Sequence, residues 1–329
     1  MSTAATPATP AAPGPVRPTR FRIWVAAARP ATLPAALSGV VVGLGAAFAT
    51  GAGLRMDTAI GCVVVALLLQ VAANFSNDLS DFRRGADTPD RQGPLRVAAA
   101  GLVTERQLEV AIGVVVVLAS LVGLWLATIG GWALVVLGAL AIVAALAYTG
   151  GPFPYGYRAL GEVFVFVFFG LVAVVGTAYL QVLRLDPLFV LAAIPPGALI
   201  TAILVVNNLR DIPTDTAAGK RTLAVVLGER RTKAEYGVLL GVAYAVPAVL
   251  AFGALLGTSS VADAALAVLV LLPLLTLPLA RPLLRTVATF GERRELNLVL
   301  KGTARLSLWF SLLFALGLAA SGLVRGGLA

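Results

Sequence analysis

Residues 58–81 read TAIGCVVVALLLQVAANFSNDLSD, and this stretch decides the fold. Its first part, residues 58–76, is almost wholly apolar, and a helix of about 20 such residues crosses a lipid bilayer. Its last part, NDLSD at 77–81, places two carboxylates at the edge of the apolar segment. Carboxylates at the edge of hydrocarbon are costly unless a partner neutralises them. The stretch therefore predicts a membrane-spanning helix that ends in a functional polar cluster.

The whole chain has the composition of a membrane protein. Of its 329 residues, 59% are hydrophobic and only 12% are charged, whereas soluble domains carry about 25% charged residues. We therefore expect an all-α, polytopic integral membrane protein, in which about nine transmembrane helices form a bundle around a central cavity. The predicted spans are residues 32–50, 58–76, 108–127, 131–149, 160–182, 187–206, 236–256, 262–282 and 304–324.

The basic residues are distributed unevenly between the two ends of these spans. In a nine-span topology only Arg55, Arg184 and Arg325 fall on one side, and all other Lys and Arg residues fall on the opposite side or at its helix ends. Cytoplasmic loops carry the excess of Lys and Arg. This predicts a cytoplasmic N-terminus, cytoplasmic polar loops and an external C-terminus. The net charge of +9 is thereby explained by topology, and no nucleic-acid partner is expected.

The N-terminal composition and the counts of histidine and cysteine limit the possible domain organisation and chemistry. Residues 1–21 are rich in Pro and Ala and predict a disordered tail, which leaves residues 22–329 as one membrane domain. The chain has no histidine, the commonest metal ligand and general base, so zinc chemistry and Ser-His catalysis are disfavoured. A single cysteine, Cys62, lies within a predicted span and excludes a disulfide framework.

A second polar cluster follows the predicted span 187–206. It reads NNLRD at 207–211, with Asp215 next. Residues three or four apart share one face of a helix, so each cluster presents a face of oxygen ligands, the kind that Mg²⁺ prefers. The alternative is that these acids are solvated charges or pair with nearby Arg, and for Asp87 and Asp90 it is equally good. The predicted metal ligands are Asp78, Asp81, Asp87, Asp211 and Asp215.

Basic and polar residues around the acids are candidates for binding a phosphorylated substrate. Arg side chains match phosphate oxygens and Lys adds a point charge, although many of these residues also serve topology. Lys220 is the best candidate, because GKRT at 219–222 closes the second acidic loop. The remaining candidates for substrate binding are Arg83, Arg84, Arg91, Arg96, Arg210, Arg221, Asn74, Asn77, Asn207 and Asn208.

Three more residues are candidates with an equally good structural interpretation. Tyr148 begins the turn-forming stretch YTGGPFPY at 148–155 and can hydrogen-bond a phosphate or an aromatic hydroxyl, or serve as an interfacial anchor. Arg158 can assist it. Arg29, before the first span, can meet an aromatic carboxylate, or it can snorkel to the membrane surface.

These motifs resemble those of the UbiA superfamily of intramembrane prenyltransferases. The first superfamily pattern is Asn-Asp-x-x-Asp-x-x-x-Asp, and residues 77–81 match its first five positions. The last position of the pattern falls on Gly85 in this chain, and the next acid is Asp87. Asp211 and Asp215 match the second pattern, Asp-x-x-x-Asp. Within the superfamily, residues 77–87, 148–152 and 207–228 are similar to 1,4-dihydroxy-2-naphthoate polyprenyltransferases of menaquinone synthesis. The resemblance covers roughly residues 22–325.

The resemblance implies a reaction. A polyprenyl group passes from polyprenyl diphosphate to 1,4-dihydroxy-2-naphthoate, with loss of CO₂ and diphosphate, giving demethylmenaquinone. Mg²⁺ assists ionisation to an allylic carbocation, Asp78, Asp81, Asp211, Asp215, Lys220 and Tyr148 form the catalytic group, and the apolar helices hold the prenyl tail. The alternatives are another acceptor (4-hydroxybenzoate, haem, a chlorophyll precursor or a phosphosugar), a membrane transporter, or a non-catalytic scaffold.

Overall fold

The computed structural model describes residues 19–51, 53–85, 96–256 and 267–326. Asp87, Asp90, Arg91 and most of the predicted tail lie outside the described residues. Within these ranges the chain is helical, and the only β-type pairing is an isolated bridge between Arg158 and Arg221. The helices are α1 (Arg20–Ala28), η1 (Pro30–Thr32), α2 (Leu33–Ala49), α3 (Met56–Arg83), α4 (Glu105–Gly130), α5 (Ala133–Ala147), η2 (Tyr155–Tyr157), α6 (Gly161–Val165), the π-helix η3 (Phe166–Val172), α7 (Ala173–Val182), α8 (Pro187–Ala217), α9 (Leu223–Leu256), η4 (Leu272–Thr276), α11 (Leu277–Thr289), η5 (Arg293–Glu295) and α12 (Leu296–Gly326).

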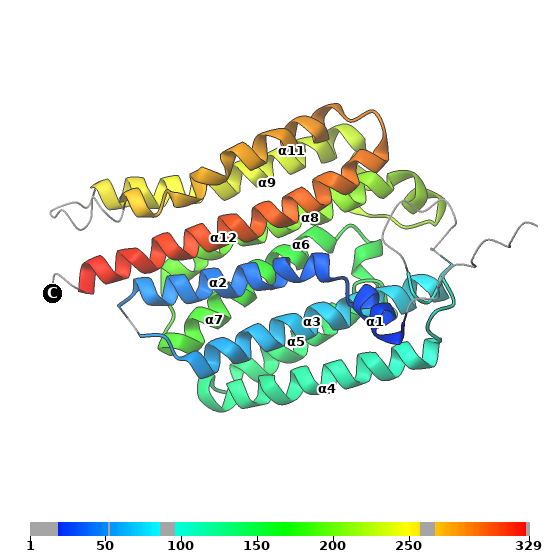
Figure 1. Ribbon diagram of the computed structural model, residues 1–329, viewed down its shortest axis with the longest axis horizontal. Helices are drawn as coiled ribbons and strands as arrows, with labels where there is room; N and C mark the ends of the chain where they lie inside the picture. Colours follow the sequence, from blue (N-terminus) through cyan, green and yellow to red (C-terminus); the bar gives the residue numbers. More distant parts are fainter. Residues whose placement is uncertain (1–18, 52, 86–95, 257–266, 327–329) are drawn as a thin grey trace, which may run out of the picture.

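The long helices run side by side along one axis and form a bundle (Figure 1). Eight helical segments of the described chain are long and apolar enough to cross a membrane, and α5 is a shorter apolar helix. Together they correspond to the nine predicted spans, which confirms the predicted fold. Because the number of crossings is odd, α1 and the end of α12 lie at opposite ends of the bundle (Figure 1). Many large apolar side chains are exposed, Trp132, Leu140 and Leu316 among them, as expected for an integral membrane protein facing lipid.

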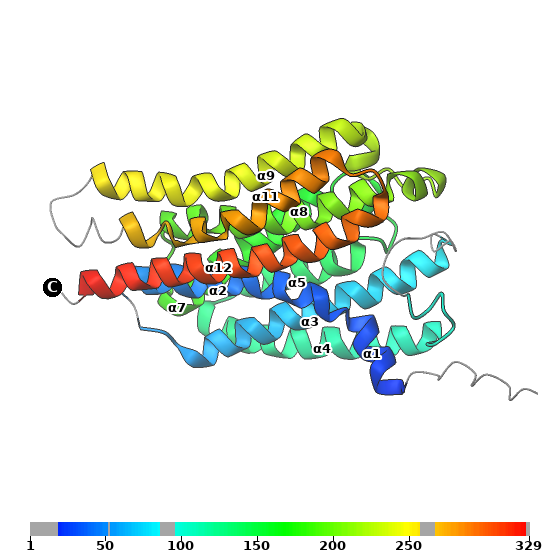
Figure 2. The ribbon, with the colours of Figure 1, turned by 45° about the horizontal axis from the view of Figure 1, so that its top comes forward.

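Helix α2 packs against α12, α8 and α7 in the centre of the molecule (Figure 2). Small residues allow this approach: a Cβ atom at Gly45 would lie 2.5 Å from the carbonyl oxygen of Ala315, and one at Gly322 would lie 2.3 Å from that of Phe48. Close helix contacts through small residues are typical of membrane helices. The largest buried apolar cluster lies between these helices and fixes α8, which carries the second acidic cluster.

Helices α3 and α8 continue beyond their predicted apolar segments, so both acidic clusters lie on final helical turns. Both helices are followed by a glycine with positive φ, Gly85 at 64° and Gly219 at 68°, which is the usual way to stop a helix. Helix α8 also continues through Pro213, which has no N–H for the carbonyl of Leu209. Arg293 donates to that carbonyl instead, at 2.6 Å, and so stabilises the last turns.

Candidate active site

A cavity of about 800 Å³ opens between the helices, with polar residues at the end where α3 and α8 stop and apolar residues along the rest. On α3 its lining extends from Cys62 to Asp81, which at a rise of about 1.5 Å per residue is about 28 Å of helix. The π-helix η3 contributes Phe168 and Phe169 to its wall, and π-helical turns are frequent at functional sites. A long apolar chamber therefore leads away from the acidic residues.

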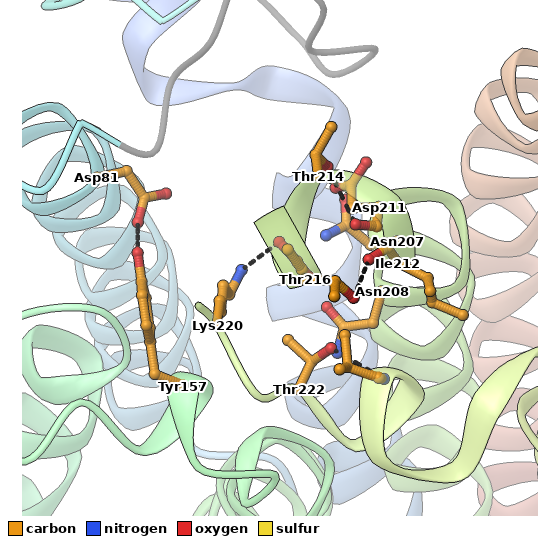
Figure 3. A network of polar contacts seen from close by, with 12 residues as sticks. Asp81, Tyr157, Asn207, Asn208, Asp211, Ile212, Thr214, Thr216, Lys220 and Thr222 are labelled. Atoms are coloured by element: carbon orange, nitrogen blue, oxygen red, sulfur yellow. Dashed lines mark hydrogen bonds and ion pairs between the residues drawn. The ribbon is translucent and has the colours of Figure 1, made fainter. Parts of the chain in front are cut away.

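Asp81 is the acid that α3 presents to this cavity. It is 5% exposed. One carboxylate oxygen forms an ion pair with Arg96, and the other accepts a hydrogen bond from the hydroxyl of Tyr157 at 3.1 Å (Figure 3). One turn earlier, Asn77 also lines the cavity, and its Oδ1 accepts from the hydroxyl of Thr149 at 2.9 Å. The predicted face of oxygen ligands is present at Asn77 and Asp81.

Asp78 does not belong to that face. Its side chain lies outside the cavity lining and is 1% exposed. Oδ2 accepts a hydrogen bond from the backbone N–H of Val97 at 3.0 Å. The sequence spacing placed Asp78 with Asp81, whereas the structure turns the two carboxylates toward different neighbours.

On α8, Asp211 reaches the cavity in a fixed pairing with its chain neighbour. Arg210 binds both carboxylate oxygens of Asp211, at 2.7 and 2.6 Å. The same guanidinium donates to Oδ1 of Asn207 and to Oδ1 of Asn297, each at 2.9 Å. Arg210 is 2% exposed, and a two-pronged Arg–carboxylate contact of this kind fixes orientation as well as charge.

Asp215, one turn further, is paired with Lys220. The ammonium nitrogen lies 3.4 Å from Oδ1 and 5.4 Å from the centre of the Tyr157 ring. Oδ2 of Asp215 has no hydrogen-bond partner among the described residues. The backbone N–H of Arg221 donates to the carbonyl of Tyr157 at 3.3 Å, and this contact holds Lys220 beside the aromatic ring. Figure 3 shows Asp81 with Tyr157 on one side of Lys220 and Asp211 with Asn207 on the other.

Two tyrosines, Tyr148 and Tyr157, follow α5 and line the cavity. Burial raises the pKa of Tyr157 above its ordinary value, and the neighbouring charge of Asp81 raises it further. The ring of Tyr148 packs edge-on against Tyr155, with 5.4 Å between the ring centres.

The carboxylates Asp81, Asp211 and Asp215 are the acids that face the cavity. No group of three or more metal-ligating side chains gathers at one point among the described residues. Mg²⁺ commonly takes one or two protein carboxylates and completes its ligand set with substrate phosphates and water. The donor set, with the unpartnered Oδ2 of Asp215, therefore fits a cation that is shared with a phosphorylated substrate rather than one held by protein alone.

Several predicted site residues point elsewhere. Arg83 pairs with Glu105 at 2.6 Å and with Glu109, and so ties α3 to α4. Arg158 is exposed and lies over the ring of Phe153, 4.2 Å from its centre. Arg221 is also exposed and outside the lining.

Two further predicted residues have supporting contacts instead. Arg84 donates to the carbonyls of Thr149 and Gly151, at 3.2 and 3.1 Å, and so holds the turn after α5. Asn208 is buried and donates to Glu162 at 2.8 Å.

Arg29 and Asn74, two of the predicted substrate-binding residues, lie in the cavity lining. Asn74 donates to the carbonyl of Ala28 at 2.9 Å and to the hydroxyl of Thr32 at 3.0 Å, so it also fixes η1 against α3. Arg29 has a left-handed backbone with φ 51°, at the break between α1 and η1.

Sequence reasoning missed Gln70, Tyr157, Thr149, Asn297 and Lys301, which all line the cavity. A signal for Gln70 was present, because it lies four residues before Asn74 and extends one polar face along α3. Asn297 and Lys301 are also four apart on α12, but they precede the predicted ninth span, and their helical periodicity was hidden by charged neighbours.

A profile of the UbiA prenyltransferase family matches residues 36–296. This chain belongs to the UbiA prenyltransferase family. A relative from Mycobacterium tuberculosis, 1,4-dihydroxy-2-naphthoate octaprenyltransferase, is 47% identical over 68% of this chain and 76% of its own length. The Haemophilus influenzae protein of the same name is 38% identical over 91% of this chain and 96% of its own.

Solved structures share the UbiA fold. A UbiA homologue from Archaeoglobus fulgidus, determined bound to DMAPP and Mg²⁺, superposes with a TM-score of 0.60 at 14% identity, over 93% of this chain and 99% of that one. This likeness establishes the fold of the helical bundle. Mg²⁺ is present in that UbiA structure. Membership of the UbiA family and the long apolar helices together identify this chain as an integral membrane protein.

Proposed function

We propose that this chain is an Mg²⁺-dependent aromatic polyprenyltransferase that joins a polyprenyl group to 1,4-dihydroxy-2-naphthoate. The products are diphosphate, CO₂ and the prenylated naphthoquinol, which is the reduced form of demethylmenaquinone. The observation that carries the proposal is that one cavity joins paired acids and cations at one end to a long apolar chamber. The names of the relatives from two bacteria supply the acceptor.

The polar end binds the diphosphate. Asp81, Asp211 and Asp215 would hold Mg²⁺, which when bound neutralises the diphosphate and makes it a better leaving group. Lys220 places a positive charge between the two acidic helix ends (Figure 3), and Arg96 adds a second from the other side. Fixed charges aimed at a departing diphosphate stabilise the transition state without reorganisation.

The chamber protects the reacting carbon and orients the acceptor. Ionised prenyl groups react with water, so a site enclosed by apolar helices favours attack by the aromatic ring. Tyr148 and Asn77 line the chamber near the acids and supply hydrogen-bonding groups for the acceptor hydroxyls. The acceptor carboxylate has cationic neighbours at the same end in Arg29 and Lys301.

The apolar length of the chamber holds the prenyl tail. Gly123 lines the cavity and a Cβ atom there would meet nothing within 4 Å, so a larger side chain would project into the chamber. Gly113, on the same helix α4, has equally open space but faces outward. We expect Gly123→Leu to lower turnover of octaprenyl diphosphate about tenfold while turnover of geranyl diphosphate changes less than about twofold. Gly113→Leu should leave both unchanged; equal losses with both donors in Gly123→Leu would contradict a tail in this chamber.

The orientation of the protein in the bacterial cell membrane follows from charge. The helix ends that surround the acids carry most of the basic residues, and short connections such as residues 183–186 carry few. We propose that the polar end of the cavity faces the cytoplasm and the C-terminus faces outward. A reporter enzyme that is active only outside the membrane should work when fused after Ala329 and fail when fused before Met1.

The direct test is product formation by the purified protein in nanodiscs. The reaction contains Mg²⁺, octaprenyl diphosphate and either 1,4-dihydroxy-2-naphthoate or 4-hydroxybenzoate, and prenylated product is followed by mass spectrometry. Product from the naphthoate that disappears on chelation is expected. Product from 4-hydroxybenzoate alone would assign another acceptor, and flux of substrate across the membrane without product would assign a transporter.

A further inference from the structure

The two acidic clusters follow the same five-residue pattern. Residues 77–81 read NDLSD and residues 207–211 read NNLRD. In both, the first and fifth positions line the cavity and the second does not. An α-helix has about 3.6 residues per turn, so a residue directly after a cavity-facing one points about 100° away. Asp78 and Asn208 therefore occupy equivalent positions on the outer faces of α3 and α8.

We propose that Asp78 is a positioning residue: it fixes Arg96 at the cavity through the backbone of Val97 and is not a metal ligand. The inference rests on the proposed function, because Arg96 acts there on the diphosphate. Its geometric basis is the 3.0 Å hydrogen bond from the Val97 N–H to Oδ2 of Asp78. Arg96 directly precedes Val97 in the chain, and its guanidinium pairs with Asp81 in the cavity lining.

The segment that Asp78 binds is firmly packed. Val97 is 0% exposed and Val103 is 7% exposed, and both belong to one buried apolar cluster with Phe75 and Leu79 of α3. The hydrogen bond at Asp78 is buried with them. It satisfies an N–H that would otherwise be left unpaired in an apolar environment, which is costly. Oδ2 of the carboxylate is thus bound to the backbone beside Arg96, while the buried Oδ1 has no hydrogen-bond partner among the described residues and lies outside the cavity lining.

The equivalent residue on α8 supports the same interpretation. Asn208 is 1% exposed, lies outside the cavity lining and donates to Glu162 of α6 at 2.8 Å. Each outer-face residue therefore binds the element next to its helix. The partner dictates the residue type: a backbone N–H needs an acceptor, whereas the Glu162 carboxylate needs a donor. Asn can also accept from an N–H, so Asp78→Asn keeps the contact with Val97 and converts NDLSD to NNLSD.

The test compares Asp78→Asn, Asp78→Leu, Arg96→Met and Asp81→Asn in nanodiscs, with kcat, the KM for polyprenyl diphosphate and the Mg²⁺ concentration for half activity as readouts. We expect Asp78→Asn to keep kcat/KM within about threefold of the parent. Asp78→Leu removes the acceptor, so it should raise the diphosphate KM about tenfold while the Mg²⁺ requirement stays unchanged. Asp78→Leu combined with Arg96→Met should be no worse than Arg96→Met alone, because both changes remove one function.

An Asp78→Asn protein that is folded, as inactive as Asp81→Asn and dependent on more Mg²⁺ would overturn the proposal. If Asp78→Leu does not fold, Asp78→Asn decides the question alone, since metal ligation and a backbone contact predict opposite results for it. Full activity in Asp81→Asn would instead contradict the proposed function, which separates the two failures.

Discussion

The two acidic helix ends have the same sequence pattern but are supported differently. At the end of α8 the cations come from nearby in the chain: Arg210 is adjacent to Asp211, and Lys220 lies five residues after Asp215. At the end of α3 the cation for Asp81 is Arg96, fifteen residues later. The α8 end is thus largely built from local sequence, whereas the α3 end depends on a separately packed segment.

This difference has a physical consequence. Helix geometry fixes which residues of α8 share a face, so Asn207, Asp211 and Asp215 keep their relative positions as long as the helix persists. The site on α3 also needs the segment from Arg96 onward to stay in place, and that segment is held against α3 by apolar packing and by the hydrogen bond from Val97 to Asp78. The α3 end should therefore also be sensitive to changes in residues outside the cavity that hold this segment, such as Asp78.

The largest effects are expected from Asp81→Asn and Asp211→Asn, which remove one cavity-facing charge at each end. Each should lower kcat at least about 100-fold, because both charges are needed to hold the cation and diphosphate. Product formation per folded protein, at saturating Mg²⁺, measures the effect. Normal activity in Asp81→Asn, even with a loss in Asp211→Asn, would contradict the proposed site, in which both helix ends hold the cation and the diphosphate.

Both variants also disturb buried ion pairs. The side chains of Arg210 and Asp211 are 1% and 13% exposed, and removing one member of a buried pair costs about 3–5 kcal/mol. Asp211→Asn keeps one hydrogen bond to Arg210 and should lose less than that. Thermal unfolding of each variant is the control that separates a folded, inactive protein from an unfolded one.

The next largest effect tests whether the basic residues of the α8 end act individually. Lys220 lines the cavity beside Asp215, while the adjacent Arg221 is exposed and contacts Tyr157 only through its backbone in the described structure. Lys220→Met should lower kcat/KM about 30-fold, mainly through loss of charge at the diphosphate. Arg221→Met is the matched control and should change kcat/KM less than about twofold. Equal losses would mean that general positive charge, rather than position, is what matters.

The sequence was sufficient for most of the fold. Apolar length alone predicted the nine crossings, because a membrane leaves few ways to satisfy the backbone. It did not predict that α3 and α8 continue to Arg83 and Ala217. Polar residues ended the hydropathy signal there although the backbone remained helical, and the contact of Arg293 with Leu209 that supports α8 comes from a distant segment.

The candidate site was predictable where helix periodicity alone decides it. Steps of four residues from Asn77 and from Asn207 reach Asp81 and Asp211, and these residues line the cavity. Asp78, one position off the face, has its orientation fixed by a backbone N–H from a later segment. Arg83 likewise pairs with Glu105 and Glu109 of α4 and does not line the cavity. Such choices depend on which element packs next to the helix, and a single sequence does not contain that information.

A smaller effect, on stability, compares the two residues that face away from the cavity, Asn208 on α8 and Asp78 on α3. Asn208→Asp would place a second carboxylate against Glu162, which is 5% exposed and accepts from Asn208. We expect the unfolding free energy to fall by about 1–3 kcal/mol, because a buried donor is replaced by a like charge. Thermal unfolding in detergent measures this. Asp78→Asn, the reverse exchange on α3, should change the melting temperature little, because Asn can also accept from the N–H of Val97; a comparable drop there would show that this contact needs the carboxylate.

The smallest effect concerns the hydrogen bond from Tyr157, in the connection before α6, to Asp81 at the end of α3. Tyr157→Phe removes the donor to Asp81 at 3.1 Å but keeps the ring near Lys220 and Arg84. Loss of a single hydrogen bond to a charged group that retains its ion pair should lower kcat/KM about threefold. Burial and the charge of Asp81 both raise the pKa of Tyr157, so the phenol keeps its proton. The ratio of the two rates should then be constant between about pH 7 and about pH 9. A ratio that falls with rising pH in this range would mean that Tyr157 ionises, and that Asp81 is held by Arg96 alone.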